Sequence, residues 1–343
     1  MGEQAAARQA AGAPASLLLT GANGFLGRAL VRRLLASGVA SSGLRCVVRD
    51  VDRAVRAGLP AESLVRADLA AGAAGPTLER ATAGVDVVVH LAGALKAYRR
   101  AGFDAVNAAG TRRLVEAVRR SAPSAHVVNI SSLAAAGPSL DGAGSAAPPD
   151  ACRPVSHYGE SKRQGELAVV ESGLDYTIVR PPVVYGPTDG ATRLLFRQAT
   201  ALAAAAPPRP RPLSIVHADD VAEAVWRAVC ARPPAACIPL DGPARTDTHA
   251  LLRAIATACG RRARLLPVPM ALASAAGLFA DLVAAARRQP AYFNRDKVRE
   301  IGAAGWVADG AAASQLLGFT PSIGLAEGLR AVAAAEGFVP ATS

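Results

Sequence analysis

The chain has 343 residues, of which 51% are hydrophobic, and it carries a formal net charge of +11. This length can bury one large domain, or a main domain with a smaller lobe, and the composition excludes a chain that is disordered throughout. Most of the positive charge comes from arginines spread over predicted helices, without interleaved aromatic residues. We therefore expect a small anionic ligand, such as a cofactor phosphate, and no nucleic-acid partner.

The five cysteines are widely spaced and none belongs to a CxxC pair. This pattern predicts neither a disulfide framework nor a metal site, and it favours a reducing compartment. The first fourteen residues are small and polar and contain no apolar leader segment, so we expect them to be flexible and the protein to be cytoplasmic.

Short apolar runs alternate with amphipathic stretches in the first half of the chain. The predicted strands are Ser16–Thr20, Leu44–Arg49, Ser63–Ala67, Val85–Leu91, His126–Ile130 and Tyr176–Val179. Predicted helices between them include Phe25–Ser37, Asp104–Ser121 and Tyr158–Ser172. This order predicts an α/β fold with a doubly wound parallel sheet, buried on both faces by helices. We assign residues 15–185 to a nucleotide-binding domain.

A mostly helical C-terminal lobe is expected over 186–343, with some elements returning to the main sheet. Segments 137–154 and 203–212 are predicted loops, the first of them flexible. The predicted helices of the lobe are Asp219–Ala231, Thr246–Gly260, Ala271–Arg288 and Leu325–Glu336. Such a lobe would cover the carboxyl ends of the strands and close a substrate pocket.

The apolar segment 265–286 could be mistaken for a membrane span. Pro267 and Pro269 interrupt its start and Asp281 lies inside it, so the unbroken stretch is too short to cross a bilayer. We expect a buried or lid helix and no integral membrane segment. Peripheral membrane contact, helped by Arg287 and Arg288, is the alternative.

A glycine turn follows the first strand, with Gly21, Gly24 and Gly27 spaced as GxxGxxG. Glycine lets the backbone turn sharply and approach a pyrophosphate, and the helix N-terminus then offers free N–H groups to the phosphates. In this strand–turn–helix context, the turn predicts a dinucleotide site rather than an ordinary tight turn.

The ends of the next strands add polar and small residues to this site. Arg49 ends the second strand and suits the 2′-phosphate of NADP, although the adjacent Asp50 could instead hold the ribose of NAD. Asp68 and Leu69 follow the third strand, where the carboxylate could accept a hydrogen bond from the adenine amino group. Leu91, Ala92 and Gly93 follow the fourth strand and are small enough for a cofactor to lie beside them. We predict NADP, with NAD as the alternative.

Tyr158 and Lys162 stand four residues apart and so share one face of a helix. A neighbouring ammonium can lower the pKa of a phenol by ~1–3 units, which prepares it for acid–base catalysis. Ser132, with Ser131 as the alternative, ends the fifth strand at the same sheet edge and could bind the reacting oxygen, or simply cap a helix. Asn107 could fix a water or the backbone near the lysine.

These motifs together resemble the extended short-chain dehydrogenases/reductases of the NAD-dependent epimerase/dehydratase type. The matching pieces are TGANGFLG at 20–27, DL at 68–69, HLAG at 90–93, NAAGT at 107–111, ISS at 130–132, YGESK at 158–162, RPPVVYGP at 180–187 and HADDVAEAV at 217–225. The resemblance implies a Rossmann fold, a bound NAD(P) and catalysis by Ser132, Tyr158 and Lys162, with Asn107 beside them. It places the cofactor against Gly21, Asn23, Gly24, Phe25, Leu26, Gly27, Arg49, Asp68, Leu69, Leu91, Ala92, Gly93, Lys162, Pro181 and Val184. The family often dimerises through two helices per subunit, here Asp104–Ser121 and Tyr158–Ser172.

Two departures narrow the function that the resemblance implies. Leu133 and Ala134 stand where sugar-nucleotide dehydratases carry an acidic pair, which disfavours dehydration. Pro181 and Pro182 resemble flavonol-type and hydroxysteroid-type reductases more than sugar epimerases. We therefore expect an NADP-preferring oxidoreductase that acts on a carbonyl or secondary alcohol of a small apolar molecule.

Two other functions remain open. The first is a nucleotide-sugar epimerase, which would bind a diphosphate through a basic lobe. Its candidate residues are Arg193, Arg197, Arg209 and Arg211. The second is a non-catalytic NADP-binding protein, although such proteins typically lack the tyrosine or the lysine.

Overall fold

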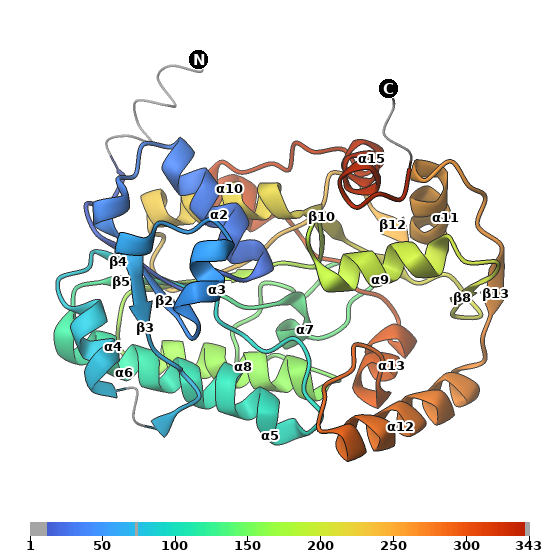
Figure 1. Cartoon of the computed structure of the whole chain (residues 1–343), viewed down its shortest axis with the longest axis horizontal. Coiled ribbons are helices and arrows are strands. Elements are labelled where there is room, and N and C mark those ends of the chain that lie inside the picture. Colours follow the sequence, from blue (N-terminus) through green and yellow to red (C-terminus); the bar gives the residue numbers. More distant parts are fainter. Residues whose placement is uncertain (1–11, 73–74, 340–343) are drawn as a thin grey trace.

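The structure is a computed structural model, which describes residues 12–72 and 75–339 of the chain. Most of the predicted flexible N-terminus, 1–14, therefore lies outside the described residues. Figure 1 shows a central sheet between helices in one half of the molecule and a largely helical region in the other half. This arrangement matches the expected α/β class.

A seven-stranded parallel sheet forms the core of the first half. Its strands are β1 (Leu17–Thr20), β2 (Leu44–Val48), β3 (Leu64–Arg66), β4 (Val87–His90), β5 (His126–Ile130), β6 (Tyr176–Arg180) and β11 (Ala236–Pro239). Their order is β11-β6-β5-β4-β1-β2-β3, and all neighbours run parallel. The six predicted strands are confirmed to within two residues at each end. The strand order reverses between β1 and β4, so a crevice is expected where these two strands end.

Helices cover both faces of the sheet (Figure 1). One face carries α2 (Phe25–Ala36), α3 (Val51–Arg56), α10 (Ala218–Ala231) and α14 (Ala311–Leu317), and the other carries α4 (Gly75–Thr82), α6 (Thr111–Ser121) and α8 (His157–Val170). Leu17 and Leu19 of β1 pack into the first of these layers and Leu18 packs into the second. A continuous apolar strand is thus buried on both sides, as doubly wound sheets require.

The C-terminal region has a separate core around α9 (Gly190–Ala199), α11 (Thr248–Ala258) and α15 (Leu325–Ala335). Three two-stranded pairs accompany this core. They are β7 (Val183–Tyr185) with β10 (Ile215–His217), β9 (Pro212–Leu213) with β12 (Thr246–Asp247), and β8 (Ala204–Ala206) with β13 (Leu265–Pro267). The prediction of an unstructured loop over 203–212 is therefore wrong for β8, because pairing with the distant β13 decides its conformation.

The predicted helix 104–121 is not a single α-helix. Its first part, Asp104–Gly110, is a π-helix, and α6 continues from Thr111. Gly165 of α8 lies against this part, and a Cβ there would be 2.4 Å from the carbonyl oxygen of Asn107. The widened turn thus lies where two helices approach most closely, and π-bulges are frequent at functional sites.

The helix α12 (Met270–Arg287) is exposed, which corrects the expectation of a buried helix. Within it only Gly277 and Ala284 are buried. It packs on α13 (Arg295–Gly302) at the edge of the molecule (Figure 1). By length and composition alone it could cross a membrane, since its 18-residue window has a mean hydropathy of 1.4 and 11% of that window is buried.

Candidate active site

The glycine turn between β1 and α2 requires glycine for steric reasons. Gly21 has φ +73°, and a Cβ there would lie 2.7 Å from the backbone nitrogen of Ala92. A Cβ on Gly27 would lie 2.2 Å from the carbonyl oxygen of Gly21. Gly24, the N-cap of α2, makes no side-chain capping bond, so the first N–H groups of the helix are left for a ligand. The turn therefore fits a pyrophosphate.

A surface hollow of about 200 Å³ begins at this turn and follows the ends of β1 to β4. It is lined by Gly21, Asn23, Gly24, Val47, Val48, Arg49, Ala67, Asp68, Leu69, Leu91, Ala92, Gly93, Ala94 and Val106. Nine of these were predicted from the sequence. The other five are neighbours in the chain of predicted residues or, like Val106, lie on the π-helix. The structure thus brings together side chains from four strand ends, as the topology requires.

Six predicted cofactor residues do not line this hollow. Phe25, Leu26 and Val184 pack against the core beside α2. Gly27 acts through the close approach of its backbone to the turn. Pro181 is buried, and its carbonyl accepts a hydrogen bond from the backbone nitrogen of Leu133 at 2.8 Å. The sixth, Lys162, lies near Gly93, since a Cβ on that glycine would be 3.6 Å from its Nζ.

The acidic neighbours of Arg49 have other hydrogen bonds. Asp50 is the N-cap of α3 and accepts from the backbone nitrogen of Arg53 at 2.9 Å. Asp68 accepts from the backbone nitrogen of Ala70 at 3.0 Å through one carboxylate oxygen. Arg49 itself is exposed and lines the hollow. Arg49 thus supplies a positive strand-end charge to the hollow, and Asp68, which also lines it, supplies a negative one.

A buried chain of polar groups supports the loop after β4. The backbone nitrogen of Ala92 donates to Thr20 Oγ1 at 3.2 Å, and this hydroxyl lies 2.7 Å from His90 Nδ1. His90 Nε2 lies 2.8 Å from Thr111 Oγ1, which donates to the carbonyl of Asn107 at 2.7 Å. Every donor in this hydrogen-bond network meets an acceptor only if His90 is neutral and carries its proton on Nε2. Sequence reasoning missed this chain, because its members lie up to 91 residues apart.

The electrostatics of His90 agree with that neutral form. Burial, together with the charge of Lys162, lowers the pKa of His90 to about 3. The folded pKa lies below the unfolded value of 6.5, so the unfolded chain binds more protons at acid pH and stability is lost as the pH falls from about 6.5 towards 3. Between pH 7 and pH 5, the wild-type protein should therefore lose about 2 kcal/mol more of its free energy of unfolding than the His90→Gln variant does.

Urea unfolding of the wild-type protein and of the His90→Gln variant, each at pH 7 and at pH 5, measures this difference in stability. The buried His126, whose pKa is lowered to about 4 by burial, is present in both proteins and cancels. Equal pH slopes in the two proteins would contradict the assignment of a buried neutral His90.

Asn107 holds the backbone after β4 rather than a reacting atom. Its Oδ1 accepts from the backbone nitrogen of Ala94 at 2.7 Å, and its Nδ2 donates to the carbonyl of Ala94 at 3.1 Å and to Ser161 Oγ at 2.9 Å. The expectation that Asn107 fixes backbone near the lysine is what the structure shows. It is therefore a positioning residue, which ties the hollow to the Tyr158 helix.

Tyr158 and Ser132 meet as the sequence suggests. The side chain of Ser132 lies beside the phenol of Tyr158 and lowers its pKa. Ser132 Oγ also accepts from the backbone nitrogen of Ala134 at 3.2 Å and caps α7 (Leu133–Ala136), so both functions considered for it coexist. Ser131 Oγ is buried and has no partner among the described residues. The contact with the phenol favours Ser132 over Ser131.

The pKa of Tyr158 moves in the opposite direction from that expected. Burial raises it strongly, the hydrogen bond from Ser132 lowers it, and the charge of Glu300 raises it further. Lys162 is not among the causes of this shift, and its Nζ donates to the carbonyl of Ile130 at 2.8 Å. Burial also lowers the pKa of Lys162 to about 8, against the opposing charge of Glu166. The surroundings of Tyr158 therefore disfavour its phenolate form.

The N-terminus of α8, just before Tyr158, is held by α13. Asp296 accepts from the backbone nitrogens of His157 at 2.7 Å and Tyr158 at 3.1 Å. Glu300 accepts from Ser156 Oγ at 2.7 Å, and that hydroxyl caps Gly159. No local motif announces a cap supplied from 139 residues away, so only the fold reveals it.

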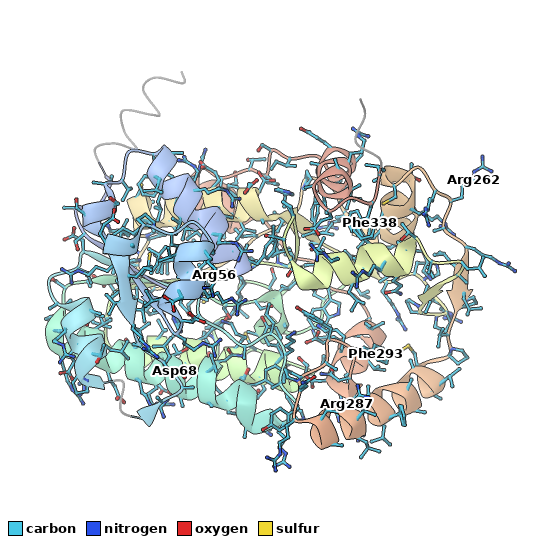
Figure 2. All side chains as sticks on the ribbon, viewed as in Figure 1. Arg56, Asp68, Arg262, Arg287, Phe293 and Phe338 are labelled. Carbon is cyan, nitrogen blue, oxygen red and sulfur yellow. The ribbon has the colours of Figure 1, made fainter. Side chains whose placement is uncertain are left out.

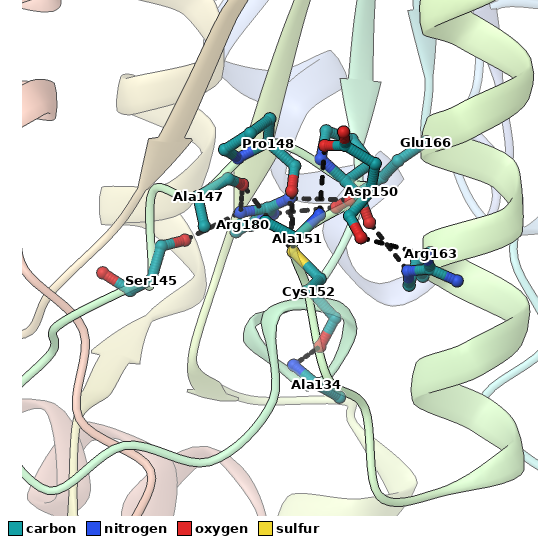
Figure 3. Close-up of polar contacts among 12 residues, drawn as sticks. Ala134, Ser145, Ala147, Pro148, Asp150, Ala151, Cys152, Arg163, Glu166 and Arg180 are labelled. Atoms are coloured by element: carbon teal, nitrogen blue, oxygen red, sulfur yellow. Dashed lines mark hydrogen bonds and ion pairs between the residues drawn. The ribbon is translucent and has the colours of Figure 1, made fainter.

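A buried ion pair anchors the loop between Ser132 and Tyr158. Arg180 and Glu166 are both fully buried, and the guanidinium donates from Nε at 2.9 Å and from Nη2 at 2.7 Å to the two carboxylate oxygens. The remaining donors reach the carbonyls of Ser145 and Ala147 and the sulfur of Cys152 (Figure 3). Segment 137–154 is therefore an anchored loop, which corrects its expected flexibility.

Comparison with known proteins identifies this arrangement. The family model described as "NAD dependent epimerase/dehydratase family" matches residues 17–235. The chain belongs to this family. It is similar to a ceramide reductase of Caulobacter vibrioides, with 34% identity over 320 residues that cover 90% of each chain. The resemblance seen in the sequence motifs is thus confirmed, and the Rossmann domain is that of a family of NAD(P)-dependent enzymes.

Solved structures share the fold over nearly the whole chain. The crystal structure of gox2253 has a TM-score of 0.74 at 22% identity and covers 95% of this chain and 99% of its own. MoeE5 in complex with UDP-glucose and NAD has a TM-score of 0.71 at 22% identity, with coverages of 94% and 98%. The UDP-glucose 4-epimerase of Thermus thermophilus, in complex with NAD, has a TM-score of 0.68 at 22% identity, with coverages of 95% and 100%. At these identities the likeness shows the epimerase/dehydratase fold alone.

Proposed function

We propose that this family member is an NADP-preferring reductase that acts on a ketone of a lipid-like substrate. The observation that carries the proposal is the geometry at the end of β5, where Ser132 lies beside Tyr158 of α8 and Lys162 Nζ, one helical turn further on, donates to the carbonyl of Ile130 at 2.8 Å. The similarity to a ceramide reductase supports a substrate in which an apolar chain surrounds the reacting carbon. The ketone that corresponds to the secondary alcohol of a ceramide-type lipid has this chemistry.

The residues of the hollow bind the cofactor, and those of the Tyr158 helix act on the substrate. The N–H groups at the start of α2 and the strand-end residues fit the phosphates and nucleosides of the cofactor. When bound, a nicotinamide cofactor supplies the hydride. Tyr158, held protonated by its raised pKa, donates a proton to the carbonyl oxygen, and the Ser132 hydroxyl orients that oxygen.

The preference for NADP rests on Arg49. Its guanidinium lines the hollow, while the carboxylate of the adjacent Asp50 is engaged by α3. We expect Arg49→Glu to lower kcat/KM for NADPH by about 100-fold, because a charge-assisted bond is replaced by repulsion of the 2′-phosphate. Activity with NADH should change by less than about threefold.

Parallel NADPH and NADH kinetics measure this selectivity. Arg53→Glu makes the same charge change four residues further along the chain, at an exposed side chain that does not line the hollow, and serves as the control. A loss of activity with both cofactors to the same extent in Arg49→Glu would count against 2′-phosphate recognition.

Arg211 favours a second candidate function, that of a nucleotide-sugar epimerase. Its Nε is buried without a partner among the described residues and could meet a diphosphate. Arg193, another candidate for that role, instead forms an ion pair with Glu336. The basic lobe that a diphosphate needs is therefore partly engaged within the protein, which ranks this function second.

One assay separates the two candidate functions. The purified protein is incubated with NADPH and either the ketone form of a ceramide-type lipid or a UDP-hexose. The reductase oxidises NADPH in step with the ketone consumed and leaves the sugar unchanged. An epimerase interconverts the sugar without net consumption of added cofactor, and that outcome would overturn the proposal.

A further inference from the structure

The outward face of α12 is apolar over its length. Leu272, Phe279 and Leu282 are 62%, 69% and 62% exposed. They are spaced by seven and three residues, so they share one side of the helix. The exposure of neighbouring apolar side chains to water is unfavourable, so a contiguous exposed apolar surface often marks a site of protein or membrane contact.

The opposite face of α12 is fixed to the protein. A Cβ on Gly277 would lie 3.0 Å from the backbone nitrogen of Arg295, so the two helices are in close backbone contact. Asp281 is the only charged residue of the helix before Arg287, and its Oδ2 accepts from the same nitrogen at 3.3 Å. The helix therefore lies along the molecular surface with its apolar face outward, an orientation suited to the plane of a bilayer rather than to crossing it.

Segment 95–100 adds exposed apolar and basic side chains beside α12. Leu95 and Tyr98 are 63% and 41% exposed. The interleaved basic residues are Lys96, Arg99 and Arg100. Part of this segment lines one surface hollow together with Asp281 and Arg295, so it adjoins α12. Tyrosine and basic side chains next to exposed leucines are typical of the interface of a membrane.

The charges around this surface indicate its partner. α12 ends at the exposed Arg287 and Arg288. The short helix α5 (Arg100–Phe103) follows segment 95–100 and lies at the same lower edge of the molecule as α12 (Figure 1), where Figure 2 also shows Arg287. We propose that α12 and segment 95–100 form a membrane-docking face, which seats the protein on a bilayer containing anionic phospholipid. Apolar side chains enter the acyl boundary and the basic residues bind phosphates.

A second copy of the chain fits this face less well. Pairing it with itself would bring the basic rims of two molecules together, each with a net charge of +11. An anionic bilayer instead neutralises them, and each basic side chain near such a surface strengthens binding by about fivefold. The charge complementarity therefore favours lipid over self-association.

The docking face is connected to the candidate active site through contacts of α13. α12 packs on α13, and Asp296 of α13 holds the backbone nitrogens of His157 and Tyr158. A protein seated through α12 would thus present the Tyr158 site next to the bilayer. This part of the inference rests on the proposed function, since it places a membrane-resident ketone as the substrate that the site receives.

Vesicle flotation of the full chain tests the docking face. The vesicles are phosphatidylcholine alone, or phosphatidylcholine with an equal amount of phosphatidylglycerol. We expect the wild-type protein to float only with the anionic vesicles, and less at high salt. Phe279→Gln with Leu282→Gln should weaken binding by at least about tenfold, and so should Arg99→Glu with Arg287→Glu.

Matched variants elsewhere on the surface serve as controls. Leu202→Gln with Leu316→Gln removes two exposed leucines, and Arg262→Glu with Arg330→Glu makes the same charge change away from α12. Figure 2 shows Arg262 at the edge of the molecule opposite Arg287. Both control pairs should bind like the wild-type protein, and thermal melting checks that all variants are folded.

Three results would overturn the proposal. They are the absence of flotation by the wild-type protein, unchanged flotation of the α12 double variant, and a dimer by light scattering that this variant dissociates without any vesicle binding. Ketone reduction is assayed separately with a short-chain, water-soluble analogue. Reduction of this analogue without vesicle binding refutes the docking face alone, and vesicle binding without reduction of any ketone refutes the proposed function alone.

Discussion

Replacement of Tyr158 by phenylalanine is expected to lower kcat/KM for ketone reduction by about 10³-fold, within the range that general acid catalysis contributes. The substitution removes the hydroxyl that we propose as the proton donor and that lies beside Ser132. It keeps the aromatic ring, which lies edge-on to Phe103 with ring centres 6.0 Å apart. Steady-state kinetics with NADPH measure the loss.

Cofactor binding and a matched variant separate chemistry from structure. Tyr158 does not line the cofactor hollow, so the Kd for NADPH should change by less than about twofold. Tyr176→Phe removes a hydroxyl from the opposite end of the sheet, where β6 begins, and should leave kcat/KM unchanged. Full activity in Tyr158→Phe would remove the main support for an enzyme and would favour a non-catalytic NADP-binding protein.

Replacement of Arg180 by methionine is expected to lower the free energy of unfolding by about 3–5 kcal/mol, because it leaves the Glu166 carboxylate buried and unpaired. Burial alone would lower the pKa of Arg180, but the charge and hydrogen bonds of the Glu166 carboxylate more than compensate and raise it. The loop that carries Ser145 and Ala147 loses its anchor as well. Urea unfolding, together with kcat, measures both consequences.

Two further variants test the physical cause of this loss. Arg180→Met combined with Glu166→Leu removes both charges and should recover most of the stability, because apolar residues of similar volume replace a buried pair well. Arg120→Met breaks the exposed pair with Glu79, whose atoms lie 2.8 Å apart, and should cost less than about 1 kcal/mol. A double variant no more stable than Arg180→Met would show that the loss comes from packing rather than from an unpaired charge.

The features that the sequence predicted are local or periodic. Apolar runs such as Leu17–Leu19 indicate strands that are buried on both faces, and the parallel sheet then places their carboxyl ends at one edge. The sequence indicates the turn through Gly21 and Gly27, because other backbone atoms lie so close to these two residues that only glycine fits there. Tyr158 and Lys162 share a helix face by their spacing alone.

The supports of the same site lie beyond such reasoning. His90 and Thr20 are 70 residues apart, and Asp296 caps a helix 139 residues before it. Sequence spacing carries no signal for a hydrogen bond of this kind, because the partners meet only after the chain has folded. The same holds for the π-helix at Asn107, which lies where α8 approaches most closely, and for the pKa of Tyr158, which depends on how deeply the phenol is buried.

Periodicity, glycine sterics and helix spacing act within short stretches of chain, so the sequence predicted the doubly wound sheet, the dinucleotide turn and the candidate set of Ser132, Tyr158 and Lys162. The tertiary structure alone decided that Arg180 pairs with Glu166, that the loop over 137–154 is anchored and that α12 is exposed. The hydrophobicity of a side chain indicates that its burial lowers the free energy, but it does not indicate which surface will cover that side chain. For α12 the protein itself supplies only part of that cover.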